Sequence, residues 1–309
     1  MKKWILLVLG FVAIAITAPT FVSAETVWYP LPQEAYKFGA RYPEAQRLLF
    51  GFDYGHALIY EKLILGKGKI TDPGKLESEL LAQILAILRN PPTNKPSEED
   101  IAPAYTYSLP LIINLFDWSH DLHQFIYDVL VTSTDRGPAM KARINEIFLQ
   151  YQGNSSVAIT NQCKTMLFMD GQYFSKAFRR TYPSLNLLIW SYHWLQIKLY
   201  EALMKPAEAD RDRGVAEVVK QFWDLVSNLP DSADFDMMPS TPKEAPTFAV
   251  AFPNVWPAFD NLHMLHDVVS DMMVSDRVSV EVFRTEGIRF GRMAQDPNAF
   301  KAPQCESSY

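Results

Sequence analysis

Residues 116–128 read FDWSHDLHQFIYD, and residues 259–271 read FDNLHMLHDVVSD. Both follow the pattern F-D-x-x-H-x-x-H-x4-D, and residues 52–56 (FDYGH) repeat its first five positions. A chain of this composition is expected to contain only about 0.02 matches to F-D-x-x-H by chance. The three matches contain five of the six histidines of the chain. We therefore expect these stretches to decide both the fold and the function.

Each stretch fits one face of an α-helix. At about 100° per residue, Asp117, His120, His123 and Asp128 fall within an arc of roughly 140°. Apolar residues recur at helical spacing around all three stretches. Helices of this kind that face one another bring imidazoles and carboxylates together, and these groups are ligands of zinc, iron, manganese and copper(II). The pattern predicts a metal site inside a helical bundle.

The histidines are the predicted metal ligands, and the aspartates are predicted to orient them. An aspartate precedes each leading histidine by three residues, even in the copy that lacks a second histidine. This favours a carboxylate that holds the other ring nitrogen over one that binds the metal itself. The predicted ligands are His56, His120, His123, His263 and His266, and the predicted orienting residues are Asp53, Asp117, Asp260, Asp128 and Asp271.

Two further residues lie near the pattern. Asp267 follows His263 by one helical turn, which makes it a candidate catalytic base, with a solvated helix residue as the alternative. His193 has no Phe-Asp pair before it, so we interpret it as a core or surface histidine rather than a ligand.

The alternative to a metal site as a whole is an Asp–His pair kept for packing. Burying several imidazoles and carboxylates without a metal or strict pairing is costly, which disfavours that alternative.

The rest of the chain predicts an all-α fold. Proline or an Asp-Pro pair opens several of the expected helices. Strand signals are nearly absent, and residues 247–252 are the one plausible short strand. We expect a single helical-bundle domain of seven to nine helices with long irregular connections at 90–104 and 230–257. The expected helices span 44–65, 74–89, 110–132, 139–150, 161–180, 184–204, 206–228, 257–274 and 277–295.

Residues 1–24 are predicted to be a signal peptide, and residues 25–309 to be the domain. Lys2 and Lys3 precede an apolar run, and residues 22–24 (VSA) form a small-residue cleavage site. That run is too short to span a membrane, and no later segment is long enough. We expect a periplasmic or secreted protein with no stable membrane span in the mature chain. Cys163 and Cys305 either pair in that compartment or stay unpaired, and the sequence leaves both possibilities open.

Composition narrows the class of function. Without Lys2 and Lys3, the chain has 27 of its 29 basic residues and 35 acidic residues, which gives a net charge of −8. This negative charge argues against nucleic acid as a partner. No G-x-S-x-G, Walker or H-E-x-x-H motif is present. The many histidines beside tyrosines and tryptophans favour an oxidoreductase that uses iron or copper and a small-molecule substrate or oxidant. The alternatives are a metal-dependent hydrolase with zinc (manganese is a further possible metal) and a non-enzymatic metal- or porphyrin-binding protein.

Overall fold

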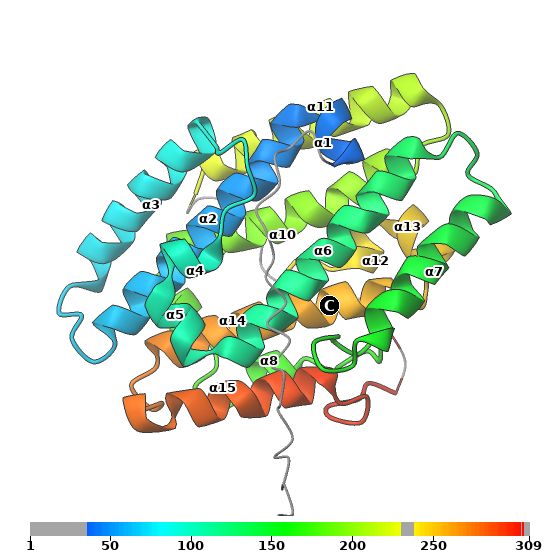
Figure 1. Ribbon diagram of the computed structural model, residues 1–309. Helices are drawn as coiled ribbons and strands as arrows, with labels where there is room; N and C mark the ends of the chain where they lie inside the picture. Colours follow the sequence, from blue (N-terminus) through cyan, green and yellow to red (C-terminus); the bar gives the residue numbers. More distant parts are fainter. Residues whose placement is uncertain (1–35, 230–237, 304, 306–309) are drawn as a thin grey trace, which may run out of the picture.

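The computed structural model describes residues 36–229, 238–303 and 305, and this part of the protein is all α-helical (Figure 1). The predicted all-α class is confirmed. The described residues form fifteen helices and no β-strand. The predicted signal peptide lies outside the described residues. The helices are α1 (Lys37–Arg41), α2 (Pro43–Gly66), α3 (Pro73–Arg89), α4 (Glu98–Ile101), α5 (Pro103–Ser108), α6 (Pro110–Thr132), α7 (Pro138–Gly153), α8 (Leu167–Asp170), α9 (Ala177–Thr181), α10 (Pro183–Leu203), α11 (Glu208–Ser227), α12 (Thr241–Glu244), α13 (Pro246–Ala251), α14 (Trp256–Val274) and α15 (Val280–Gln295).

The number of helices exceeds the predicted seven to nine because short helices occupy the connections. Eight helices have sixteen residues or more, and the other seven have six or fewer. The expected strand at 247–252 is wrong, because this segment is α13. Pro246 stands at the start of α13, and Glu201 accepts the free N–H of Thr247 at 2.9 Å, so the local chain is held as a helix.

The expected helix at 161–180 is also wrong. Only α8 and α9 form there, because the preceding backbone pairs with the C-terminal tail. The N–H of Thr165 donates to the carbonyl of Phe300 at 2.7 Å, and the N–H of Ala302 donates to the carbonyl of Cys163 at 2.8 Å. A disulfide joins Cys163 to Cys305, which resolves the alternative that the sequence left open.

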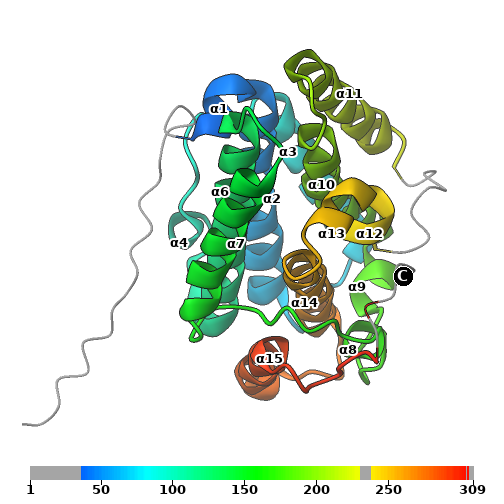
Figure 2. The same ribbon diagram turned by 90° about the vertical axis from the view of Figure 1, so that its right-hand side faces the viewer.

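Four long helices, α2, α6, α10 and α14, form the centre of the protein. Each has one long helix packed on its outer side: α3 on α2, α7 on α6, α11 on α10 and α15 on α14. In Figure 2, α2 and α6 stand nearly upright, whereas α10 and α14 are seen almost end on, so the two pairs cross. Every residue of α14 except the last is buried, as expected for a helix that is surrounded on all sides. No helix in the described part of the chain is long and apolar enough to cross a membrane.

The two halves of the chain are built on one plan. Residues 96–128 and 239–271 align without a gap and share eleven of their 33 residues, against about two expected by chance. Residues 38–63 align with residues 178–203 in the same way and share the spacing F-x3-Y-P. The order of elements repeats as well, because α1 to α7 correspond to α9 to α15. The structure is therefore an internal duplication.

Equivalent residues of the two halves make equivalent contacts. The carboxylate of Asp128 accepts the N–H of Phe38 in α1 at 2.9 Å, and that of Asp271 accepts the N–H of Phe178 in α9 at 2.8 Å. The equivalent glutamates Glu61 and Glu201 act at adjacent positions of α5 and α13: Glu61 accepts the N–H of Tyr105 (3.0 Å), and Glu201 accepts that of Thr247 (2.9 Å), one position earlier in the alignment. These contacts satisfy N–H groups that the short helices leave free. The duplication thus extends from the sequence to individual hydrogen bonds.

Candidate metal centre

All six histidines of the chain lie in one cluster between α2, α6, α10 and α14. Five are buried, and His120 is partly exposed. The rings follow one another around a closed circle, with ring centres separated as follows: His56–His266 5.0 Å, His266–His120 5.6 Å, His120–His123 6.4 Å, His123–His263 6.0 Å, His263–His193 4.2 Å and His193–His56 6.0 Å. The five histidines of the pattern come together, and a sixth joins them.

His193, which we interpreted as a core or surface histidine, is fully buried and lies within the cluster. Its ring is stacked against His263 at 4.2 Å and lies 5.0 Å from His266. The Phe-Asp pattern did not reveal this histidine because its part of the chain is the second copy of α2, where the motif has diverged. Aligning residues 38–63 with 178–203 places His193 at the position of Asp53. The duplication is the sequence signal that identifies it.

Three of the histidines lie close enough together to hold one metal ion. One ring nitrogen each of His56, His193 and His266 lies within 4.8 Å of the other two. Two ligands of one tetrahedral zinc ion are about 3.3 Å apart, so modest rotations of the rings suffice to share an ion. The three residues come from α2, α10 and α14.

The hydrogen bond of His266 shows which of its nitrogens is available. Its Nδ1 lies 3.1 Å from the carbonyl oxygen of Leu262. A carbonyl only accepts hydrogen bonds, so Nδ1 carries the proton and Nε2 keeps a free lone pair. That Nε2 is buried and has no hydrogen-bond partner among the described residues. A backbone carbonyl that fixes the ring of a metal-binding histidine in this way is common in metal sites.

Unpartnered nitrogens are a property of the whole cluster. Eight buried ring nitrogens of the six histidines have no hydrogen-bond partner within the described part of the chain. A buried polar atom left unpaired costs about 1–3 kcal/mol, so the cluster is costly to bury as it stands. A bound ion relieves part of this cost, because it replaces the missing hydrogen bonds with metal–nitrogen bonds.

Burial also keeps the imidazoles in the form that binds metals. Burial lowers the pKa of His56 to about 3, and the nearby His120 adds to this effect. Burial and the neighbouring imidazoles likewise hold the pKa values of His193 and His266 well below their ordinary range. The three rings are therefore neutral at pH 7, with lone pairs free to bind a cation.

The phenylalanines of the two long copies of the pattern cover imidazoles on the opposite helix. Phe116 on α6 stacks on His266 of α14, with ring centres 3.8 Å apart and an interplanar angle of 20°. Phe259 on α14 stacks on His123 of α6 at 3.9 Å and the same angle. Each of the two helices thus supplies a phenylalanine that stacks on a histidine of the other, because α6 and α14 are equivalent in the duplication. It explains why phenylalanine belongs to the repeated motif.

The aspartates of the pattern make other contacts than those predicted. In residues 36–229 and 238–303, no hydrogen bond joins any of the five to a histidine. Their carboxylates hold neighbouring segments, and Asp117 lies near the charge of Lys95. Asp53 accepts a hydrogen bond from the hydroxyl of Tyr192 (2.9 Å), Asp260 from that of Thr241 (2.6 Å), Asp128 from the N–H of Phe38 (2.9 Å) and Asp271 from the N–H groups of Lys176 (2.6 Å) and Phe178 (2.8 Å). The pattern revealed the residues but not their partners, which are distant in sequence.

Asp267, the predicted catalytic base, is buried beside the cluster. The indole N–H of Trp190 donates to its two carboxylate oxygens at 3.1 and 3.3 Å. Burial raises the pKa of Asp267 to about 7, and the charge of Arg179 opposes the rise. Its carboxylate is not one of the atoms that converge with the three histidines.

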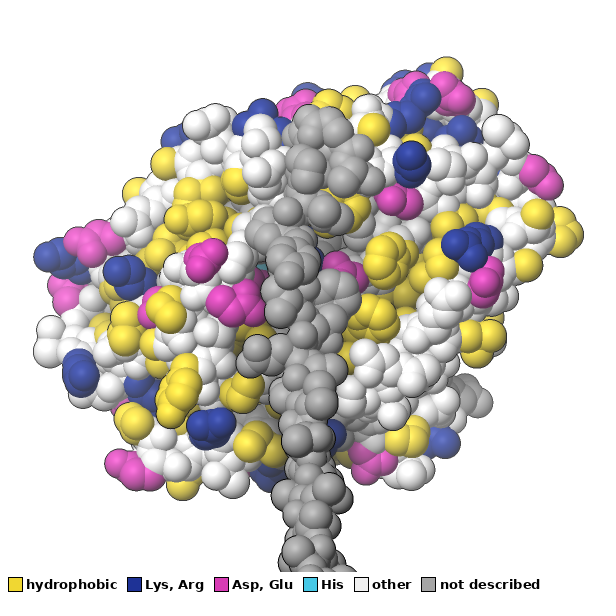
Figure 3. Space-filling model, viewed as in Figure 1, with side chains coloured by type: hydrophobic (Ala, Val, Ile, Leu, Met, Phe, Trp, Pro, Cys, Tyr) yellow, Lys and Arg dark blue, Asp and Glu magenta, His cyan; other side chains and the backbone are white. Residues whose placement is uncertain are grey.

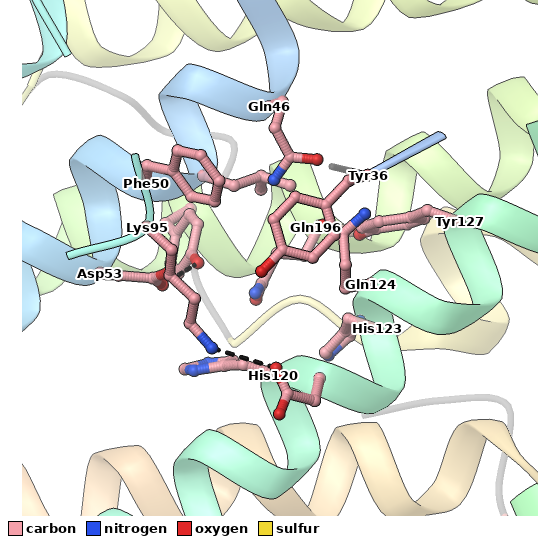
Figure 4. A pocket seen from close by; sticks show the side chains of 13 residues that line it. Tyr36, Gln46, Phe50, Asp53, Lys95, His120, His123, Gln124, Tyr127 and Gln196 are labelled. Carbon is pink, nitrogen blue, oxygen red and sulfur yellow. Dashed lines mark hydrogen bonds and ion pairs between the residues drawn. The ribbon is translucent and has the colours of Figure 1, made fainter. Parts of the chain in front are cut away.

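A small cavity adjoins the cluster and is shown in Figure 4. It measures about 30 Å³, roughly the space of two or three water molecules. Its walls come from α2, α6, α10 and the segment before α4, and Lys95 forms an ion pair with Asp121 at 3.0 Å there. Burial alone lowers the pKa of Lys95, but the nearby carboxylates, led by Asp121, outweigh this effect and raise it. The motif predicted Asp53, His120 and His123 of this lining, but not Lys95 and Asp121, which are not motif positions.

Known proteins do not add to this description. No protein family matches the chain, and no curated protein or solved structure matches it either.

On the face seen in Figure 3, basic side chains are scattered among acidic and apolar ones and form no continuous basic stripe. The function must therefore be argued from the histidine cluster.

Proposed function

We propose that His56, His193 and His266 bind one transition-metal ion and that the protein is an exported oxidoreductase acting with a small oxidant. The observation that carries the proposal is the convergence of three neutral, buried imidazoles, each with at least one ring nitrogen that lacks a hydrogen-bond partner among the described residues. The disulfide between Cys163 and Cys305 supports export, since such bonds persist in oxidising compartments. The predicted signal peptide at residues 1–24 agrees with this.

The ligand set favours iron or copper. Imidazole suits copper, iron and zinc, whereas manganese and magnesium prefer carboxylate and water oxygens. No carboxylate belongs to the converging group among the described residues. Zinc fits the same three nitrogens. Manganese, which the sequence left possible, is less well supported.

The size of the adjoining cavity favours a small reaction partner. A space of about 30 Å³ admits water, dioxygen or peroxide but not a peptide, an ester or a porphyrin. The other hollows described, such as the one lined by Arg41 and Asp212, contain no histidine. Asp267, the base that a hydrolase would need, is held by Trp190. These observations favour the oxidoreductase over the hydrolase and the porphyrin-binding protein.

Metal analysis and an optical spectrum of the purified protein test the proposal. We expect about one iron or copper ion per chain and an absorption band that changes when peroxide or dioxygen is added. One zinc ion in a colourless protein supports the metal site but overturns the redox function. Absence of any bound metal after reconstitution with iron, copper and zinc overturns the proposal as a whole.

A further inference from the structure

The cavity occupies the place that the duplication assigns to a second three-histidine site. The sequence alignment of the halves pairs His266 with His123, His193 with Asp53, and His56 with Gln196. All three counterparts line the cavity. Both sites therefore take residues from both halves: His56 joins His193 and His266 in one, and Gln196 joins Asp53 and His123 in the other. The first site presents three imidazoles, and the second presents an imidazole, a carboxylate and an amide at the equivalent positions.

Contacts around the two sites confirm that they correspond. Phe52 and its counterpart Tyr192 stack on each other, with ring centres 3.9 Å apart and planes 2° from parallel, as expected beside a pseudo-two-fold axis. The hydroxyl of Tyr60 reaches the carbonyl oxygen of His266 at 3.4 Å. Its counterpart Tyr200 shares a hydrogen bond of 2.6 Å with Nδ1 of His123. Equivalent tyrosines therefore contact equivalent histidines, Tyr60 at the backbone of His266 and Tyr200 at the ring of His123.

Several buried polar atoms of the residues that line the cavity lack hydrogen-bond partners, and three of them are acceptor oxygens. Gln46 and Gln196 are 1% and 3% exposed, and neither side-chain oxygen has a partner in the described part of the chain. The same is true of Oδ2 of Asp121 and of Nε2 of His120 and His123. The ammonium group of Lys95 donates to Oδ1 of Asp121. Figure 4 shows that these side chains approach the cavity from several elements.

We propose that this cavity is a second ligand site, derived from the same structural positions as the three-histidine site, and that it binds a small neutral molecule that donates hydrogen bonds. Hydrogen peroxide is the member of this class that suits a redox metal beside it. This choice rests on the proposed function and narrows the small oxidant to peroxide. The existence of the site does not depend on the metal.

Other ligand classes fit the cavity less well. Dioxygen has no hydrogen to offer to the unpaired oxygens of Gln46 and Gln196. An anion meets the carboxylates of Asp53 and Asp121, which are balanced by Lys95 alone. A metal ion meets the ammonium group of Lys95 and finds only one imidazole among the three equivalent positions. Peroxide has two O–H donors and the size of about two water molecules, and the cavity has room for it.

The position of the cavity suits delivery of peroxide to the metal. His120 lines the cavity, and its ring centre lies 5.6 Å from that of His266. A molecule in the cavity is therefore separated from the proposed metal site by one imidazole. The phenol of Tyr192 also lines the cavity, and its ring lies 5.7 Å from that of His56.

The test is a titration of the mature chain, freed of paramagnetic metal, with hydrogen peroxide, followed by NMR of histidine-labelled protein. We expect saturable shifts of the His120 and His123 resonances. In Gln196→Leu, which removes an acceptor at nearly constant volume, we expect the apparent Kd to rise at least tenfold. Gln46→Leu is the second variant should the first fail to fold. Gln83→Leu, the same change on an exposed site of α3, is expected to titrate as the wild type does.

The outcomes separate the cavity from the metal site. Shifts that do not saturate in the wild type overturn the proposal, as does wild-type affinity in folded Gln196→Leu and Gln46→Leu. Metal content is measured on separate aliquots of the same preparations after reconstitution and is expected to be unchanged in both variants. A wild type that binds no metal but gives saturable shifts refutes the proposed function and leaves the cavity site supported.

Discussion

Individual imidazoles differ in what their surroundings allow. Nε2 of His266 has a free lone pair because its Nδ1 donates to a carbonyl, whereas Nδ1 of His123 is engaged by Tyr200. The repeated pattern treats these two histidines as equivalent. Their hydrogen bonds to distant residues distinguish them, and a single sequence does not show such bonds.

The first prediction separates ligands from neighbours within the cluster. We expect His193→Ala and His266→Ala to abolish stoichiometric metal, because each removes one of three converging nitrogens. The control is His120→Ala, which lies in the same cluster but outside that group, and we expect it to retain about one metal per chain. The sequence pattern alone predicts the opposite: loss of metal in His120→Ala and retention of metal in His193→Ala. Metal-to-protein ratios after dialysis decide between the two assignments, and equal loss in all three variants contradicts ours.

At the scale of elements, periodicity and proline identified the long helices well. Pro43, Pro110 and Pro183 each stand at the start of a helix. The short helices were missed because four to six residues give too little periodicity to distinguish a helix turn from a strand or a loop. Helix α13 depends on Glu201, 46 residues away in the chain, so its own sequence does not determine it.

The second prediction concerns the aspartates that end the long motif. Asp128 and Asp271 accept N–H groups of α1 and α9 and thereby fix these short helices to α6 and α14. We expect Asp128→Ala and Asp271→Ala each to lower the free energy of unfolding by about 1–2 kcal/mol, the usual cost of losing a helix cap. Metal stoichiometry is expected to stay unchanged. Asp276→Ala, on an exposed site, is the control for chemical denaturation.

Loss of metal without loss of stability in Asp128→Ala or Asp271→Ala would restore the role that the pattern suggested, in which these carboxylates orient the ligands. Calorimetry and metal analysis of one preparation distinguish the two roles, because a cap affects unfolding alone.

At the scale of the whole molecule, duplication explains both the symmetry of the fold and the asymmetry of the site. The two halves retain Phe116 and Phe259 as ring covers, but they present different groups at the centre. The all-α class and the convergence of five histidines followed from the repeated motif. The position of His193 did not, because α10 does not carry the motif although it is equivalent to α2 in the duplication.

The third prediction tests whether the cavity and the metal site are equivalent. In the variant Asp53→His with Gln196→His, the two new histidines and His123 give the cavity three imidazoles. They stand at the positions equivalent to the three histidines of the metal site. We expect the metal content to rise from about one ion per chain to about two. The matched variant His193→Asp with His56→Gln is expected to bind none. Circular dichroism checks that both remain folded, and a stoichiometry of one in the folded first variant contradicts the equivalence of the two sites.

The central claim is that three imidazoles from α2, α10 and α14 bind one metal ion. X-ray absorption spectroscopy of the wild type, reconstituted with copper or iron, tests it most directly. We predict one ion per chain with three imidazole nitrogens at about 2.0–2.1 Å, as in other histidine sites. A first coordination sphere of oxygen or sulfur alone, or a protein that retains no metal after reconstitution, would contradict the claim.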